Sequence, residues 1–462
     1  MCALQAMTVE MLADTLTPVS AYLKLCSGER DSFLFESGET VESVGRYSIV
    51  AWDPLCTLAL DQGQVRLEFN GRSASHAQED FFTLARDTLS DLSCTGLPPL
   101  PFVGSLVGCL GYDVVRLIER LPPPTAGHMP QARLCFPSCF AVFDHVHRLL
   151  TLVAIDSDPA IGRAKLQETR RRLSLPLRLG GQKSMVSMQA PPKERFVQAV
   201  QRAKQYILEG DIFQVVLSDV FSGQTSLDPF NVYRWLRVKS PSPYMFFLNF
   251  GDCQLVGASP ETMVRVKDGS VLLRPIAGTR GRSADSQRDQ ELEQEMLGSD
   301  KECAEHVMLV DLARNDAGRV CRYGSVGVDP YMTVERYSHV MHIVSQVTGS
   351  LLPGLDAWDA FRAGFPAGTV SGAPKVRAME IIDELEAAPR GAYAGAVGFF
   401  GPGQQMDTCI GIRMIQFNGE RFTLQAGAGI VADSIPEMEY QEIQHKAAQG
   451  LAALQAAGEE GL

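Results

Sequence analysis

Two stretches of the chain carry pairs of glutamates three residues apart, a spacing that puts both carboxylates on one face of a helix. Glu302 and Glu305 form the first pair, and Glu439 and Glu442 form the second. If the two faces meet, four carboxylates surround one point, which needs a cation to be stable. Mg²⁺ suits such a point because it prefers oxygen ligands. The alternative is that the glutamates only favour the N-terminal ends of their helices, with Glu302 as a capping residue.

Basic residues and glycines near the second glutamate pair suit an anionic ligand. Lys446 falls on the same side of the expected helix as that pair, and Arg413 falls on an expected strand. Both can hold an anionic group, although Arg413 is equally open to a structural ion pair. Gly427 and Gly429 follow a strand expected at 421–426. Because glycine lacks a Cβ, backbone N–H groups at these positions can approach an anion closely.

Helices and strands must position these residues. Hydrophobic spacing and capping residues predict helices at 78–92, 159–173, 193–208, 300–314, 375–386 and from Pro436 to about residue 455. Alternation and turn residues predict strands at 31–37, 45–50, 57–60, 65–69, 211–221, 246–250, 254–258, 270–275, 392–400, 407–417 and 421–426. The charged segment 281–298 is expected to be mobile. Many strands mixed with helices, without strict alternation, indicate an α+β fold.

A stretch with glycine and proline at 180–192 is the best candidate for a linker between domains. It predicts an N-terminal domain at 1–185 and a second domain at 192–456. The alternative is that the two halves share a sheet and are not separable.

The composition excludes several classes of function. The net charge of −12 argues against nucleic acid as a partner. The eleven cysteines lack the spacing of metal ligands, so we expect reduced cysteines in a cytoplasmic protein. The first ten residues lack the basic region and apolar core of a signal peptide, and no apolar run is long enough to span a bilayer. Neither a membrane nor a nucleic acid is an expected partner.

Several motifs together resemble one enzyme family. They are Asp211–Ser218, Pro241–Phe247, Arg274–Arg280, Met308–Asp316, Tyr337–His342, Gly368–Lys375 and Gln425–Ser434. In these motifs the chain resembles the chorismate-utilising enzymes, and within them the large subunits of anthranilate synthase, over about residues 15–455. The resemblance implies a large α+β fold with extensive, mostly antiparallel sheets flanked by helices, in two closely associated subdomains. It also implies that residues 192–456 bind chorismate.

The resemblance implies roles for the residues that stand at matching positions. Glu305 and Glu442 would bind Mg²⁺ with Glu439 beside them, and Glu302 would donate a proton to the leaving hydroxyl. Thr279 would hydrogen-bond the substrate, and His342 would assist elimination. From the residues alone, His342 is equally well explained as a histidine of the core. Groups implied to hold the substrate are Gly278, Tyr393, Arg413, Gly427, Gly429 and Lys446.

The implied reaction joins chorismate and ammonia. Ammonia adds to the ring as a hydroxyl leaves, and pyruvate is then eliminated to give anthranilate, a step in tryptophan biosynthesis. Gln214 stands where water-using relatives typically have a lysine, and Ala277 stands where aminodeoxychorismate synthases typically have one. Both residues therefore favour anthranilate synthase. The alternatives are the large subunit of aminodeoxychorismate synthase and a non-catalytic regulatory relative.

The resemblance also implies a regulator and a partner subunit. L-Tryptophan would bind as feedback inhibitor in the N-terminal domain, through Glu36 and Ser37 together with Pro243, Tyr244 and Met245. The alternative is that 31–37 is an ordinary strand with solvated ends. Because no glutaminase domain fits within 462 residues beside this one, we expect a separate glutamine amidotransferase subunit to supply ammonia.

Overall fold

Two long antiparallel strands, β3 (Tyr47–Asp61) and β8 (Ala132–Asp144), form the centre of the fold in this computed structural model. The structure describes residues 4–38, 45–69, 71–123, 131–177, 183–337 and 340–460. The register of the β3–β8 pair shifts between Pro54 and Cys56. Such a shift bends a ladder locally. On either side of it the pair continues into a different set of strands, so two large sheets share these two strands.

The first sheet extends from the Tyr47 end of β3. Its strands, in order, are β6 (Cys94–Thr95), β1 (Leu4–Leu12), β9 (Leu149–Asp156), β8, β3, β2 (Ser32–Glu36), β12 (Tyr244–Asn249), β13 (Gln254–Ser259), β24 (Met414–Asn418), β25 (Arg421–Ile430), β11 (Gln214–Gln224) and β10 (Ser187–Gln189), with β21 (Gly372–Ala373) beside the start of β11. Apart from β1 and β6, these neighbours are antiparallel.

The second sheet extends from the other end of the central pair. Its strands, in order, are β5 (Arg72–Ala77), β4 (Gln64–Phe69), β3, β8, β7 (Leu106–Leu110), β22 (Ala396–Gly401), β23 (Gln405–Ile410), β14 (Thr262–Lys267), β15 (Ser270–Leu273), β20 (Val347–Ser350) and β17 (Gly327–Val328), all antiparallel. A separate small sheet has the order β16 (Ile276–Gly281), β19 (Val340–Val344) and β18 (Thr333–Arg336).

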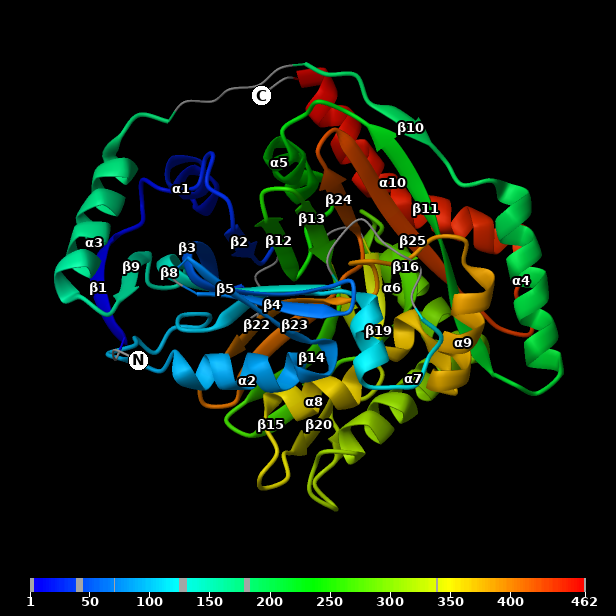
Figure 1. Cartoon of the computed structure of the whole chain (residues 1–462). Coiled ribbons are helices and arrows are strands. Elements are labelled where there is room, and N and C mark those ends of the chain that lie inside the picture. Colours follow the sequence, from blue (N-terminus) through cyan, green and yellow to red (C-terminus); the bar gives the residue numbers. More distant parts are fainter. Residues whose placement is uncertain are drawn as a thin grey trace.

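Helices flank the sheets, as expected from the sequence. Those against the first sheet are α1 (Pro18–Leu25), α3 (Pro159–Ser174), α4 (Lys193–Leu208), α5 (Pro229–Lys239), α9 (Lys375–Leu385) and α10 (Pro436–Glu460). Against the second sheet and the small sheet lie α6 (Ser286–Leu297), α7 (Asp300–Gly318) and α8 (Ala357–Gly364), and α2 (Phe81–Asp91) packs on α8. Short 3₁₀ turns are Gln78–Asp80, Tyr112–Leu117 and Gly368–Val370. Figure 1 shows α10 running beside β25 and β11. In the described part of the chain, no helix is long and apolar enough to cross a membrane.

Each large sheet joins strands from both halves of the chain. β2 pairs with β12 in the first sheet, and β7 pairs with β22 in the second. One continuous hydrophobic core runs through both halves. The expected linker at 180–192 lies outside the described residues at 180–182, while β10 within it pairs with β11. The division into domains at 1–185 and 192–456 stays a prediction.

The segment expected to be mobile, 281–298, contains a helix. α6 begins after Asp285, whose side chain accepts a hydrogen bond from the Arg288 backbone. The Arg288 side chain then pairs with Glu291 and Glu295 along the same helix. The expectation was wrong at 286–297 because a high density of charge stabilises a helix when opposite charges fall on one face. The other helices expected between 78 and 386 are confirmed to within a few residues, except that α7 runs on to Gly318.

Candidate active site

The paired strands β11 and β25 form one wall of the candidate site. Gly427 and Gly429 lie within β25 and pair with residues of β11, so the expected end of this strand at residue 426 was too early. A Cβ on Gly427 would lie 2.5 Å from the Tyr393 hydroxyl, and one on Gly429 would lie 2.6 Å from Gln214 Nε2. Glycine is therefore needed at both positions to leave space for these two side chains.

Helix α10 places the second glutamate pair and Lys446 against this wall, as their spacing predicted. Lys446 Nζ is 2.6 Å from Glu442 Oε1 and donates a 2.9 Å hydrogen bond to the Gly427 carbonyl. Glu439 lies one turn earlier, and burial raises the pKa of its carboxyl, with the Glu442 charge adding to the effect. The helix begins at Pro436 and continues to Glu460, beyond the end expected near residue 455.

Helix α7 carries the first glutamate pair, and its two members have different environments. Glu305 accepts a 3.3 Å hydrogen bond from Gln214 Nε2, and its pKa is raised by burial and then by the Glu442 charge. Glu302 instead accepts a 2.6 Å bond from Arg280 Nη1, while its Oε2 is buried without a partner. The structure therefore brings Glu305 towards Glu442 and pairs Glu302 with an arginine.

The carboxylates at this site fit a divalent cation better as a pair than as a group of four. Within the described residues, no group of three or more His, Cys, Asp and Glu side chains is placed to hold a metal ion. The negative charge of Glu442 nevertheless acts on Glu305 and raises the pKa of its carboxyl. Mg²⁺ commonly binds only one or two protein carboxylates and keeps several waters. Glu305 and Glu442 are therefore the residues that would hold Mg²⁺, with Glu439 beside them.

The small sheet brings Gly278, Thr279 and His342 together. His342 Nδ1 donates a 2.9 Å hydrogen bond to the Gly278 carbonyl and lies 3.1 Å from Thr279 Oγ1. Since a carbonyl only accepts, Nδ1 carries the proton and Nε2 of the neutral ring has a free lone pair. Burial lowers the pKa of His342, which keeps the ring neutral near pH 7. Ser338 and His339 of the same motif lie outside the described residues.

The sequence predicted that Arg413 lies on a strand, but the structure places it between β23 and β24. Its φ of 52° turns the chain there, and the neighbouring backbone of Gly411 accepts a hydrogen bond from Ala394. Arg413 Nη1 is 3.4 Å from the Lys446 carbonyl. Burial lowers the pKa of the Arg413 guanidinium, and the nearby Tyr393 and Glu442 oppose that shift. The bend thus buries the positively charged Arg413 side chain near Tyr393 and Glu442.

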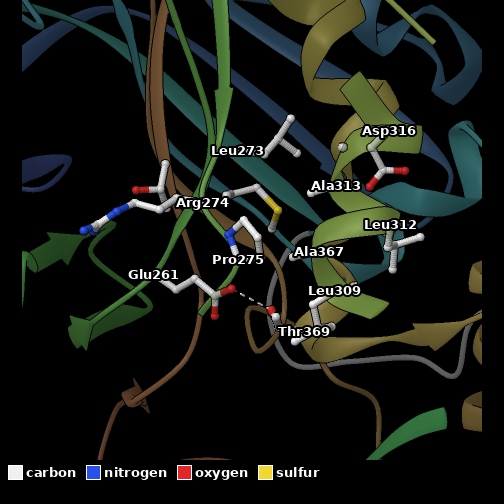
Figure 2. Close-up of a pocket in the computed structure, with 14 residues that line it drawn as sticks. Glu261, Leu273, Arg274, Pro275, Leu309, Leu312, Ala313, Asp316, Ala367 and Thr369 are labelled. Carbon is white, nitrogen blue, oxygen red and sulfur yellow. Dashed lines mark hydrogen bonds between the residues drawn. The ribbon is translucent and has the colours of Figure 1, made fainter. Parts of the chain in front are cut away.

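One buried carboxyl at this site was not predicted from the sequence. Glu261, just before β14, accepts a 2.9 Å hydrogen bond from Thr369 Oγ1 (Figure 2). Burial raises its pKa to about 8, although the charges of Lys446 and Arg274 lower it. It lines a cavity of about 30 Å³, with room for one or two water-sized molecules. A single acidic residue within the mostly apolar segment 255–266 was the available signal in the sequence.

A second, larger cavity collects all five residues predicted to bind an inhibitor. Its volume is about 590 Å³, and its lining includes Glu36, Ser37, Pro243, Tyr244 and Met245. The Tyr244 hydroxyl donates a hydrogen bond to the Asp407 carboxylate and is also bonded to the Thr262 hydroxyl.

The carboxylate of Glu36 in this cavity is engaged by the protein itself. It accepts a 2.6 Å bond from the Tyr233 hydroxyl and pairs with Arg237 at 2.8 Å, both on α5. Glu36 therefore anchors β2 to α5, and a ligand in the cavity would meet a carboxylate that is already bonded.

Comparisons with known proteins bear directly on this site. Residues 30–452 match the family described as chorismate binding enzyme. The chain belongs to the chorismate-binding enzyme family. Within this family it is 41% identical to anthranilate synthase component 1 of Acetivibrio thermocellus, over 98% of this chain and 95% of that protein.

Solved structures of chorismate-binding enzymes share the fold. Anthranilate synthase component I from Streptococcus pneumoniae is 36% identical, with a TM-score of 0.78 over 95% of this chain and 99% of that one. The menaquinone-specific isochorismate synthase from Escherichia coli, at 20% identity, has a TM-score of 0.75 over 98% of this chain and 96% of that one. The predicted family and the predicted α+β fold with mostly antiparallel sheets and flanking helices are confirmed.

We expect the Glu305→Gln and Glu442→Gln variants to bind Mg²⁺ about tenfold more weakly or worse, because each loses a charged oxygen ligand. Calorimetric titration with Mg²⁺, in the absence of any substrate, measures the affinity. Glu437→Gln removes an exposed carboxylate from the first turn of α10 and serves as the matched control. Unchanged Mg²⁺ affinity in both site variants would contradict the assignment of these ligands.

Proposed function

We propose that this chain is the chorismate-converting component of an anthranilate synthase, forming anthranilate and pyruvate from chorismate and ammonia. The observation that carries the proposal is the similarity to anthranilate synthase component 1 along nearly the whole chain. We further propose that a separate glutamine amidotransferase subunit supplies the ammonia, and that the pair works in the cytoplasm. The described cysteines are all free, which supports a reducing compartment.

The residues around the nucleophile support ammonia rather than water as the attacking group. Gln214 occupies the position opposite Glu305 with a neutral amide, and its Oε1 is buried without a partner. An amide cannot take a proton from water, whereas ammonia attacks without prior deprotonation. Ala277 is buried in β16 and offers no amine beside the ring, which supports loss of pyruvate over retention of an aminated intermediate.

Glu261 is better suited than Glu302 to protonate the leaving hydroxyl. Hydroxide leaves only with a proton, so the donor must be a neutral acid at working pH. Burial gives Glu261 a pKa of about 8, so it is protonated at neutral pH. Glu302 remains a predicted donor, but one of its oxygens is already engaged by Arg280 at 2.6 Å.

The other site residues have complementary tasks in this mechanism. Arg413, Lys446 and Tyr393 would bind the carboxylates of chorismate, and Mg²⁺ held by Glu305 and Glu442 would supply the charge that stabilises its ring carboxylate. His342 Nε2, neutral and unprotonated, would take the ring proton as the enolpyruvyl group leaves and the ring becomes aromatic. Thr279 would donate a hydrogen bond to the substrate.

We expect the purified chain to form equal amounts of anthranilate and pyruvate from chorismate with Mg²⁺ and ammonium, and to form neither with glutamine. Anthranilate fluorescence and the mass of the product identify the reaction. Aminodeoxychorismate without pyruvate would show the alternative activity, and isochorismate would mean that water is the nucleophile. Turnover of glutamine by the chain alone would contradict the need for a second subunit.

We expect kcat/KM to fall above about pH 8 as Glu261 loses its proton, because only the acid form can protonate the leaving hydroxyl. Glu261→Gln should lower kcat about 100-fold or more by removing that proton. Glu302→Gln is the comparison, and we expect it to retain the alkaline limb of the pH profile. A larger loss in Glu302→Gln than in Glu261→Gln would transfer the donor role to Glu302.

We propose that the 590 Å³ cavity binds L-tryptophan as feedback inhibitor, supported by the five predicted residues that line it. Its remaining lining includes Phe102 and Phe399, whose rings suit a flat aromatic ligand. Tryptophan should therefore reduce turnover of chorismate at micromolar concentrations, and phenylalanine should not. A flat response to tryptophan up to millimolar concentration would refute the regulatory role.

A further inference from the structure

A buried ion pair lies near Tyr393, in the loop between α9 and β22 that also carries this tyrosine. The Arg390 and Glu386 side chains are only 2% and 5% exposed, and they meet at 2.6 Å in the loop between α9 and β22. A second bond of 2.8 Å joins Arg390 Nε to the other Glu386 oxygen. The pair is thus bidentate, the geometry that holds a guanidinium and a carboxylate in one fixed orientation.

Arg390 also joins separate segments of the site. Its Nη2 donates a 2.8 Å hydrogen bond to the Val216 carbonyl on β11, and its Nη1 donates one of 2.6 Å to the Val370 carbonyl. Val216 is two residues from Gln214, and Val370 is next to Thr369. Arg390 therefore bonds both β11, which carries Gln214, and the turn that carries Thr369, the partner of Glu261.

The pair reaches Tyr393 by two routes. The Arg390 guanidinium lies 5.6 Å from the centre of the Tyr393 ring, within cation–π range. Glu386 Oε1 accepts hydrogen bonds of 2.7 Å from both the backbone and the hydroxyl of Ser218. A Cβ on Gly427 would lie 3.1 Å from the Ser218 Cβ and 2.5 Å from the Tyr393 hydroxyl, so these two side chains are neighbours at that glycine. The ion pair thus contacts the Tyr393 ring directly and holds Ser218, which lies beside the Tyr393 hydroxyl.

Stability alone does not account for such a pair. Removing two charges from water costs free energy that their attraction often fails to recover, and apolar side chains of similar volume are commonly as stabilising. A buried pair with every bond directed at segments of one site instead suits the orientation of that site. Arg390 also lies 4.7 Å from the centre of the Tyr112 ring, so the pair is packed between Tyr112 and Tyr393.

We propose that Arg390 and Glu386 are positioning residues that fix the Tyr393 hydroxyl, through Ser218, in the orientation that binds a substrate carboxylate. This inference rests on the proposed function, because it takes chorismate as the ligand of Tyr393. Neither residue touches the substrate. Their effect is on its affinity, transmitted by Ser218 and the Tyr393 ring.

The test compares KM for chorismate among Tyr393→Phe, Ser218→Ala and the double variant, at saturating Mg²⁺ and ammonium. Each single change should raise KM about tenfold, as expected for one hydrogen bond to a charged group. If Ser218 acts by orienting Tyr393, the double variant should have a KM within twofold of the singles. A KM about 100-fold higher in the double variant, the product of the two single effects, would overturn the proposal.

Arg390→Lys tests the ion pair itself, because lysine keeps the charge but loses the bidentate geometry. A positioning role predicts a KM at least tenfold higher. A purely structural role would reduce the fraction of active molecules, and hence the apparent kcat, while the active remainder kept the wild-type KM. Arg377→Lys on α9 is the matched control, since Arg377 pairs with Asp211 and Glu380 at the surface. We expect its KM to be unchanged.

The wild-type product separates this inference from the proposed function. If the chain forms no anthranilate, the proposed function fails, and the dissociation constant of chorismate, measured by calorimetry, replaces KM in the same comparison. Equal affinities of wild type and Ser218→Ala would then overturn the positioning role. A tenfold loss of chorismate affinity in Ser218→Ala, with no further loss when Tyr393→Phe is added, would support the positioning role.

Discussion

The hydrogen-bonded ladder between β11 and β25 is the constraint on which the candidate site depends. It sets Gly427 and Gly429 beside β11, where their missing side chains leave space for Tyr393 and Gln214. Helix α10 follows β25 directly and packs on it, so the register of the ladder also fixes where Glu442 and Lys446 lie. A shift of one residue would turn every side chain of the strand to the opposite face.

Charge in the site is organised by giving each buried ionisable group a different environment. Glu261 is buried beside a hydroxyl and stays protonated at neutral pH. Glu305 faces Glu442, whose charge raises the pKa of the Glu305 carboxyl, and a cation bound here would relieve the repulsion. Glu302 has an arginine as its partner. Carboxyl groups of one chemical type thus have different environments: one is buried beside a hydroxyl, two face each other, and one is paired with an arginine.

Local patterns predicted the parts of the site that a single element determines. Glu439, Glu442 and Lys446 were found from helical spacing because a helix fixes their relative positions by itself. Glu261 was not found, because its pKa arises from segments distant in sequence, including Thr369.

Other differences from the sequence-based predictions have the same cause. The approach of Glu305 to Glu442 was only a possibility in the sequence, since it depends on how α7 and α10 pack across the sheet. Arg413 was placed on a strand because the bend that carries it has no proline, and its neighbour Gly411 was not recognised as a turn residue. Helix α6 was missed because composition shows how much charge a segment has, not which charges face each other.

The pairing of early strands with late ones has a consequence for how the chain is made. On the ribosome, β2 and β7 emerge long before their partners β12 and β22, which belong to the other half of the chain. Until those partners are synthesised, the first half has open strand edges that can pair with other nascent chains. Such long-range pairing also slows folding, because distant segments must be brought together first. The wall of the candidate site formed by β11 and β25 is completed last, when β25 and α10 leave the ribosome.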